Sequence, residues 1–118
     1  MIRILLVDDH KLIRVGLRNV LEGNADMEIV GEAGDGEEAL RLARETKPDV
    51  VVLDINMPEM NGVEATRKLA RLDSAPRILI VSVHKQDPIP TRLLEAGASG
   101  YLTKDLAADE IVAAVRQV

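Results

Sequence analysis

The sequence predicts an α/β domain, a doubly wound (βα)5 unit whose five parallel strands are covered by helices on both faces. Two observations carry this prediction. Short apolar runs alternate along the 118 residues with longer segments whose apolar residues recur at helical spacing. Three of the runs also lack the polar alternation of a half-exposed strand, which is typical of strands buried on both faces of a parallel sheet.

Five segments are predicted to be strands, and their composition indicates their places in the sheet. They are Ile2 to Val7, Glu28 to Ala33, Val50 to Leu53, Arg77 to Val81 and Ser99 to Leu102. The first, third and fourth contain unbroken apolar runs and are expected at the centre. The second carries two glutamates and the fifth is short, so both are expected at the edges. We therefore expect the strand order 2-1-3-4-5 of flavodoxin-like sheets.

The segments between the strands are predicted to be helices. Two show apolar stripes, which are Ile13, Leu17, Val20 and Leu21 in the first and Ile111, Ala114, Val115 and Val118 in the last. Two others are marked by their starts, a capping sequence from Asp35 to Glu38 and a glycine at Gly62. A further, weakly patterned helix is expected from about Pro90 to about Gly97.

Composition excludes several classes of function. The chain has no cysteine, which rules out thiol chemistry, zinc-thiolate sites and disulfide scaffolds. Its formal net charge of -5 makes it a poor candidate for binding nucleic acid or an anionic membrane by itself. Tyr101 is the one aromatic residue, so stacking on bases is not available as a binding mode. Because no apolar run reaches the ~20 residues of a membrane span, we expect a soluble, cytoplasmic protein.

Polar residues follow four of the predicted strands. Asp8 and Asp9 come after the first strand, Asp54 after the third, Ser82 after the fourth and Lys104 after the fifth. Any one of them alone would be interpreted as a helix cap or a turn residue. The carboxyl ends of parallel strands, however, meet at one edge of the sheet, where ligands bind in doubly wound folds. We therefore expect these five side chains to share one crevice.

The chemistry of this group favours phosphoryl transfer with a divalent cation. Three carboxylates and one ammonium leave a net negative charge, and Mg²⁺ prefers such oxygen ligands. A carboxylate such as that of Asp54 can act as a nucleophile and form an aspartyl phosphate. The cation, the Ser82 hydroxyl and the Lys104 ammonium would then position the phosphoryl group and stabilise its charge.

These residues resemble a known family. Asp8-Asp9, the stretch Asp54-Ile55-Asn56-Met57-Pro58 ending in Gly62, Ser82, and Tyr101-Leu102-Thr103-Lys104 resemble the receiver domain of bacterial two-component response regulators. The resemblance covers essentially the whole chain. It implies that Asp54 is the phosphoacceptor of a sensor histidine kinase, which donates the phosphoryl group.

The resemblance also implies a role for each remaining site residue. Asp9 would be a direct Mg²⁺ ligand and Asp8 an indirect one through water, while Asn56 would lend its backbone carbonyl to the metal. The other three, Ser82, Lys104 and Tyr101, would be the switch hydroxyl, the phosphate-pairing lysine and the switch aromatic. From the residues alone, Tyr101 could equally be a half-buried tyrosine of an edge strand.

Within the family, Asp8-Asp9-His10, Glu64 to Lys68 and Ala96 to Leu102 are similar to the NarL/LuxR-type subfamily, and Asp87 to Leu94 to the global regulators of GacA or UvrY type. This similarity implies a homodimer on phosphorylation. It also implies DNA binding only through a C-terminal helix-turn-helix domain, which is absent from this chain. Residues 1–118 are expected to be the receiver domain, with no membrane partner.

Other functions stay open as alternatives. A Mg²⁺-dependent phosphohydrolase of haloacid-dehalogenase type has a second aspartate two residues after its nucleophile, which acts as the general acid. This chain has Asn56 there, and an amide cannot transfer that proton, so we expect poor turnover and no classical enzyme. A flavin carrier would need a hydroxyl-rich loop where Asp8 and Asp9 stand. A receiver-like interaction module that works without phosphorylation is the third alternative.

Four further groups of charged or ionisable residues are expected to have no role in the chemistry. His10 and His84 flank the crevice and are interpreted as rim residues, because Mg²⁺ prefers oxygen to imidazole. The charges from Arg41 to Lys47 are expected to form a solvated helix face. The same is expected of the basic patch of Arg67, Lys68 and Arg71, for which contact with a partner protein is the alternative.

Overall fold

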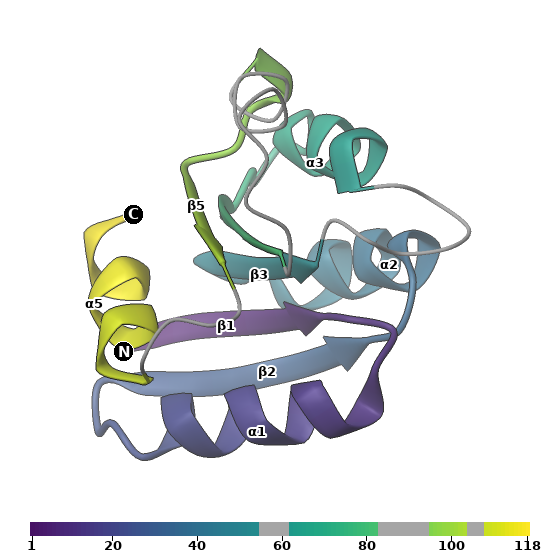
Figure 1. Ribbon diagram of the computed structural model, residues 1–118. Coiled ribbons are helices and arrows are strands. Elements are labelled where there is room, and N and C mark those ends of the chain that lie inside the picture. Colours follow the sequence, from purple (N-terminus) through teal and green to yellow (C-terminus); the bar gives the residue numbers. More distant parts are fainter. Residues whose placement is uncertain (55–61, 83–94, 104–107) are drawn as a thin grey trace.

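The computed structural model describes residues 1–54, 62–82, 95–103 and 108–118 (Figure 1). Its elements in chain order are β1 (Ile2–Val7), α1 (Lys11–Glu22), β2 (Met27–Ala33), α2 (Gly36–Thr46), β3 (Val50–Asp54), α3 (Gly62–Ala70), β4 (Arg77–Ser82), β5 (Gly100–Thr103) and α5 (Ala108–Gln117). Each predicted strand is confirmed to within one residue at both ends. None of these helices is long and apolar enough to cross a membrane.

The five strands form one parallel sheet in the order β2-β1-β3-β4-β5, which confirms the predicted topology. The edge strands are the two that were expected, β2 with its glutamates and the short β5. The pairing of β3 with β1 and with β4 has a regular register, in which Val7 lies opposite Leu53 and Asp54 lies opposite Val81. The ends of β1, β3 and β4 are therefore level at the carboxyl edge, so the residues that follow them lie close together.

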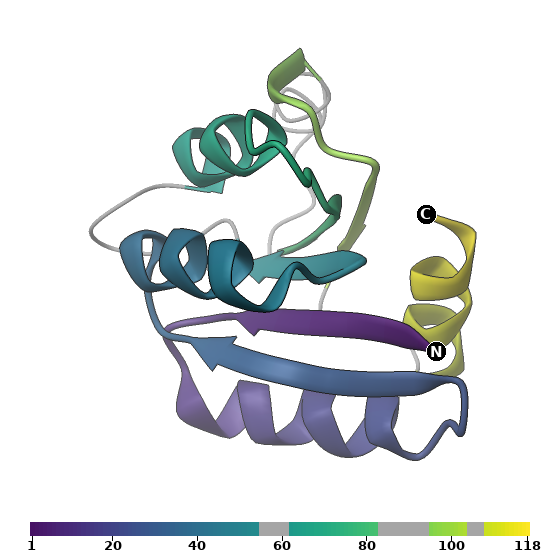
Figure 2. The ribbon, with the colours of Figure 1, turned by 180° about the vertical axis from the view of Figure 1, so that it is seen from behind.

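Successive residues of each central strand point to opposite faces, and each face carries its own apolar layer. On one face α2 and α3 cover Leu5, Val7, Val51, Leu53, Ile78 and Ile80. On the other face α1 and α5 cover Ile4, Leu6, Val50, Val52, Leu79 and Val81. Figures 1 and 2 show the two pairs of helices on their separate sides of the sheet. The central strands are thus buried from both sides, as their unbroken apolar runs predict.

Local signals place the helices where the sequence predicts them. At the start of α2, the carboxylate of Asp35 accepts the N–H of Glu38 at 2.8 Å, and Glu38 Oε1 accepts the N–H of Gly34 at 2.9 Å. This reciprocal pair is the predicted capping box, shifted by one residue at its second bond. The predicted helix from Pro90 lies outside the described residues except for its end, where Gly97 has a φ of 119°.

Gly97 is required by both its backbone and its surroundings. A φ of 119° is rare for any residue with a side chain. A Cβ atom added there would also lie 2.6 Å from the Cβ of Ala70 in α3. The glycine therefore lets the chain leading to β5 pass close against the end of α3.

Candidate functional site

Three predicted carboxylates meet at the carboxyl edge of the sheet. Asp8 and Asp9 follow β1, and Asp54 is the last residue of β3. Together with His10 they offer four ligand atoms, one from each residue, which all lie within 4.8 Å of one another. The predicted convergence of Asp8, Asp9 and Asp54 is therefore present in the structure, and the imidazole of His10 joins them.

The register of the sheet explains why these carboxylates meet. Val7 of β1 lies opposite Leu53 of β3, so the next residues along the two strands, Asp8 and Asp54, follow side by side. The N–H of Asp8 also donates to the carbonyl of Ala33 at 3.0 Å, which ties the start of the β1–α1 loop to β2. β1 stands between β2 and β3, with the crossover helices on opposite faces, which is the switch point where doubly wound sheets bind their ligands.

The three carboxylates differ in how deeply they are buried. Asp8 and Asp54 are each only 2% exposed, whereas the side chain of Asp9 is 26% exposed. Two buried carboxylates so close together repel each other and lose hydration, which is costly unless a cation or a proton compensates. An oxygen-rich cluster with one partly exposed carboxylate suits Mg²⁺, which keeps several of its waters and takes one or two carboxylates. The residues present therefore fit a magnesium ion.

His10 is tied to both aspartates that precede it. Its backbone N–H donates to Asp8 Oδ1 at 2.8 Å, as in an Asx turn. Its ring Nδ1 lies 3.2 Å from the same oxygen and 2.9 Å from Asp9 Oδ1. The ring is 61% exposed, so His10 lies at the rim as expected, but in direct contact with the carboxylates.

A second layer around the site was not predicted from the sequence. The guanidinium of Arg14 in α1 donates to the backbone carbonyl of Asp8 and, through Nε, to Glu32 Oε1 at 3.3 Å. The other oxygen of Glu32 accepts from Arg18, and the hydrogen bonds of Arg18 to Glu32 and Glu22 raise its pKa above the usual value. Arg14 is only 18% exposed. One edge glutamate thus anchors an arginine that holds the loop carrying Asp8 and Asp9.

The remaining predicted residues are placed only in part. Ser82 is the last residue of β4, at the carboxyl end of that strand as the sequence predicts. Tyr101 lies in the edge strand β5, opposite Ile80 of β4. Asn56 and Lys104 lie outside the described residues, as does His84. Their proposed roles therefore remain predictions.

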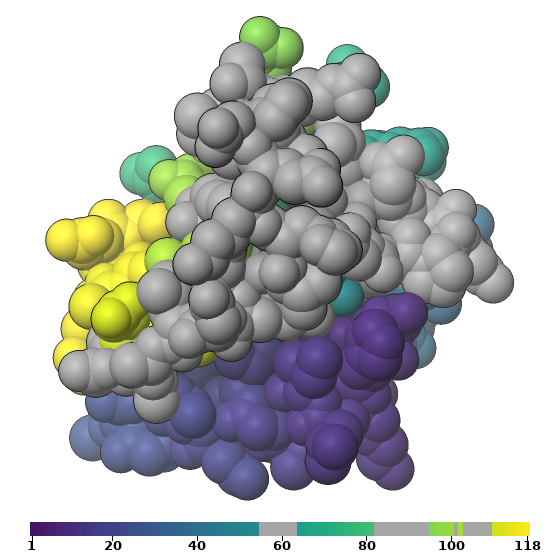
Figure 3. Space-filling view, viewed as in Figure 1, coloured from purple at the N-terminus to yellow at the C-terminus, as the bar shows by residue number. Residues whose placement is uncertain are grey.

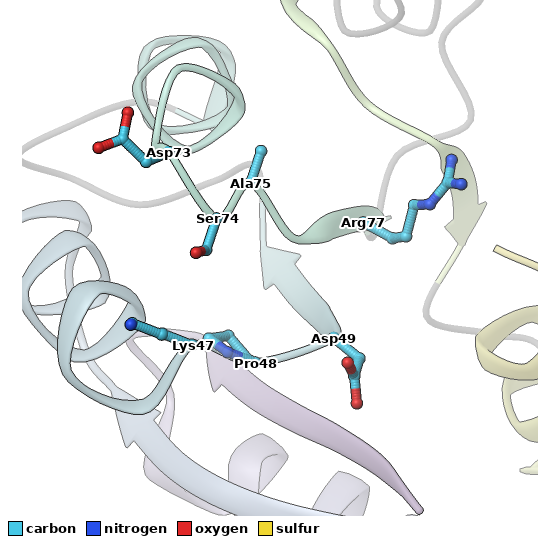
Figure 4. A pocket seen from close by; sticks show the side chains of 7 residues that line it. All are labelled: Lys47, Pro48, Asp49, Asp73, Ser74, Ala75 and Arg77. Carbon is cyan, nitrogen blue, oxygen red and sulfur yellow. The ribbon is translucent and has the colours of Figure 1, made fainter.

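A hollow lies at the opposite edge of the sheet, away from this chemistry. Its volume is about 580 Å³ (Figure 4). It is lined by residues just before β3 and by residues before and at the start of β4, which are Lys47, Pro48, Asp49, Asp73, Ser74, Ala75 and Arg77. The side chains of Lys47 and Arg77 point away from each other in Figure 4, and Asp49 accepts the backbone N–H of Arg3 at 2.9 Å. Apart from Pro48 its lining residues are exposed. The hollow gathers no convergent set of reactive groups, so we place the site at the carboxyl edge.

Comparison with known proteins agrees with this placement. The family model described as the response regulator receiver domain matches residues 4–116. The response regulator GacA of Pseudomonas aeruginosa is 49% identical over 118 residues, which are 100% of this chain and 55% of GacA. The response regulator UvrY of Escherichia coli strain K12 is 46% identical over the same residues, which are 54% of UvrY. The chain spans about half the length of these curated relatives.

Among solved structures, the signal receiver domain of the response regulator NarL from Mycobacterium tuberculosis superposes with a TM-score of 0.94. Its sequence is 37% identical, and the match covers 98% of this chain and 94% of that one. The whole described fold therefore has a close counterpart.

Proposed function

The chain belongs to the response regulator receiver family of two-component systems, and from that premise we propose that Asp54 accepts a phosphoryl group from a sensor histidine kinase. The observation that carries the proposal is the meeting of Asp54 with Asp8 and Asp9 at the switch point of the sheet. Family membership makes the chain a signalling receiver and not a classical enzyme.

The chemistry proposed for Asp54 is a single transfer. A carboxylate oxygen attacks the phosphorus of a phosphohistidine, the O–P bond forms, the N–P bond breaks, and the departing imidazole takes up a proton. Asp9 would hold Mg²⁺ directly, Asp8 through a water molecule, and Asn56 through its backbone carbonyl. Bound Mg²⁺ supplies positive charge that offsets the carboxylates and the phosphoryl oxygens.

The switch is proposed to run through the neighbouring strands. Ser82 ends β4, whose Val81 lies opposite Asp54, so a hydroxyl at this position suits a new phosphoryl group. Lys104 follows the last residue of β5, Thr103, which lies opposite Ser82. We expect the Lys104 ammonium to pair with the phosphate and Tyr101 to move with Ser82. Phosphorylation shifts the equilibrium between two conformations of the receiver only through contacts that differ between them, and the proposed contacts are those of the phosphoryl group with Ser82 and Lys104.

The output is proposed from the relatives. Their chains are about twice as long as this one, which supports a C-terminal DNA-binding domain in the whole protein. Phosphorylation would then favour a homodimer that regulates transcription in the cytoplasm. The acidic balance of the receiver, with a formal net charge of -5, leaves DNA contact to that further domain.

The test is phosphorylation by a small donor. Purified protein is incubated with acetyl phosphate and Mg²⁺, and intact masses are compared for the wild type, Asp54→Asn and the control Asp73→Asn. Asp73 is an exposed aspartate at the opposite edge, so it matches the charge change without touching the site.

We expect one phosphoryl adduct in the wild type and in the control, dependent on Mg²⁺, and none in Asp54→Asn. An adduct that persists in Asp54→Asn would assign a different acceptor. No adduct in any protein, with Mg²⁺ binding verified, would instead indicate an interaction module that works without phosphorylation.

A further inference from the structure

We propose that two copies of this protein pair through the outer face of α1, with the two helices antiparallel and crossing near Gly16. The juxtaposition that supports it is one exposed stripe on α1, in which Leu12, Val15 and Gly16 lie between a lysine at one end and a glutamate at the other. The inference deepens the proposed function, since it assigns a surface to the homodimer proposed there, and it rests on that function for any effect of phosphorylation.

The outer face of α1 exposes apolar side chains that the core does not use. Leu12 is 84% exposed and Val15 is 43% exposed, and among the described residues Met1 is the only other large apolar side chain that is exposed. Residues three and four apart share one face of a helix, so Leu12, Val15 and Gly16 lie together. Figures 1 and 2 show α1 at the border of the molecule, with the sheet on its other side. A partner on this outer face would remove the apolar side chains from water.

The surroundings of Gly16 give no reason for a glycine within the fold. A Cβ atom added there would meet nothing within 4 Å, and α1 runs through this position from Lys11 to Glu22. Glycine inside a helix is unfavourable relative to alanine, because it loses more conformational freedom on folding. A missing side chain is useful, however, where a second backbone approaches closely, since side chains at the contact set the distance between helices. Gly16 therefore suits a helix crossing on the outer face.

The charges of α1 make this face complementary to itself when two copies lie antiparallel. Lys11 and Glu22 are both exposed, and they stand about three helical turns apart on the same side of α1. In an antiparallel pair the lysine of each copy lies opposite the glutamate of the other, so symmetry forms two ion pairs. Glu22 Oε1 accepts the Nε–H of Arg18 at 2.9 Å, and a carboxylate has room to accept from a lysine as well. A parallel pair would instead place like charges together.

The position of Gly16 along the helix favours a second copy of this chain over a different protein. In a symmetric pair, the two-fold axis passes midway between Lys11 and Glu22, and the residue nearest the axis meets its own copy. Gly16 is next to that midpoint, so the two helices meet where the side chain is smallest. A different partner imposes no such symmetry on the face that it binds.

The proposed interface is small, so the pairing is expected to be weak and reversible. Helix α1 has 12 residues and is therefore about 18 Å long. One face of such a helix buries less than the about 800 Å² per partner of a standard stable interface. Reversible pairing suits a receiver whose association state is proposed to change with a signal.

The test measures self-association by sedimentation velocity at protein concentrations up to about 1 mM, with and without acetyl phosphate and Mg²⁺. The proteins are the wild type, Lys11→Glu, Glu22→Lys and an equal mixture of these two variants. Glu37→Lys is the matched control, because Glu37 is exposed on α2, which covers the other face of the sheet.

We expect the wild type and the control to associate. Each α1 variant alone should associate about 10-fold more weakly, because like charges then meet twice across the interface. The mixture should recover the affinity of the wild type, since each variant supplies the charge that the other requires. Recovery in the mixture is specific to an antiparallel pair and does not arise from damage to the fold.

Two further variants separate the interface from stability. Gly16→Gln places a long side chain at the crossing and raises the helix propensity of α1. It should weaken association, while its melting temperature in dilute solution stays at or above that of the wild type. Leu12→Ser should also weaken association with little change in melting temperature, because Leu12 is exposed in the single copy.

Three results would overturn the inference. The first is a wild type that stays monomeric with and without acetyl phosphate, and the second is association that the α1 variants leave unchanged. The third is a mixture of Lys11→Glu and Glu22→Lys that associates no better than either variant alone. Failure of the proposed function has a different outcome, in which association still depends on α1 but acetyl phosphate leaves no Mg²⁺-dependent adduct on Asp54, and the inference then stands.

Discussion

The two edges of the sheet are both charged, yet they are built in opposite ways. The amino edge has the hollow of about 580 Å³, with exposed side chains of both signs that point in different directions. Among the described residues, the carboxyl edge brings three carboxylates together, two of them at 2% exposure, beside an imidazole. Function in this fold follows the convergence and burial of like groups, because only these create a demand for a cation. The volume of a hollow is a poorer indicator of where the functional site lies.

The contrast also appears in how the chain holds each edge. At the carboxyl edge, the backbone of the Asp8 loop is held from β2 by Ala33 and from α1 by Arg14. In the space-filling view, α1 lies at the lower part of the visible face, coloured purple to blue (Figure 3). Leu12 of this helix is 84% exposed. Helix α1 therefore supports the site through Arg14, while Leu12 on the same helix is exposed to solvent.

The largest expected effect comes from the core that both edges share. Leu53 is fully buried in β3, one residue before Asp54, so Leu53→Ala should lower the free energy of unfolding by about 2–5 kcal/mol. Urea denaturation measures the change. The control Leu12→Ala, on the exposed side of α1, should cost less than about 0.5 kcal/mol. Equal losses in the two variants would show that Leu53 is not packed as described.

The next effect tests the repulsion at the carboxyl edge directly. In a buffer with a chelator and no divalent cation, Asp54→Asn should raise the free energy of unfolding by on the order of 1–2 kcal/mol, because one of several close carboxylates loses its charge. Asp73→Asn at the amino edge should change it little. Added Mg²⁺ should then stabilise the wild type more than Asp54→Asn. A stabilisation by Mg²⁺ of equal size in both proteins would contradict this account of the edge.

A smaller effect is expected from the layer behind the site. Arg14→Gln removes the guanidinium that bonds both Asp8 and Glu32, and should cost about 0.5–1.5 kcal/mol of stability. It should also weaken Mg²⁺ binding several-fold, since the loop that carries Asp8 and Asp9 is less well held. Glu32→Gln keeps the bond to the Asp8 carbonyl and should affect Mg²⁺ less. If Glu32→Gln weakens Mg²⁺ binding as much as Arg14→Gln does, the hydrogen bond from Arg14 to the Asp8 carbonyl does not account for the effect on Mg²⁺ affinity.

The smallest effect lies on the surface, where the end of α5 meets the residue that precedes β2. Arg116 donates to Asp26 at 2.9 and 3.0 Å, and this hydrogen bonding lowers the pKa of Asp26 below its usual 3.8. Because the folded pKa is lowered, the stabilisation is present above about pH 4 and is lost as the pH falls through the folded pKa. Both side chains are about half exposed, so the gain is small.

Melting temperatures of the wild type and Asp26→Asn, compared from neutral pH down to acid, measure this contribution. The wild type should melt slightly higher at neutral pH, and the difference should vanish in acid. A difference that grows in acid would reverse the sign of the linkage.

Much of the fold and part of the site could be predicted from the sequence. The predicted bounds of all five strands agree with the structure to within one residue, and the central and edge positions followed from the unbroken apolar runs of three strands and from the charge or shortness of the other two. Asp8, Asp9 and Asp54 were predicted to meet because they follow strands whose ends share one edge. These features depend on local periodicity and on a rule of topology, and both can be inferred from the order of residues.

Other features depend on how distant segments come to lie together. Glu32 is an ordinary edge charge in the sequence, and only the packing of α1 on β2 makes it the anchor of Arg14. The place of His10 against two carboxylates depends on the turn that begins α1. The irregular pairing of β1 with β2 between Ile4 and Leu5 has no clear signal in the sequence either. The sequence by itself determined the elements, their order and the edge that holds the acidic cluster, whereas the tertiary structure decided which side chains support it, because such contacts depend on register and packing between residues far apart in the chain.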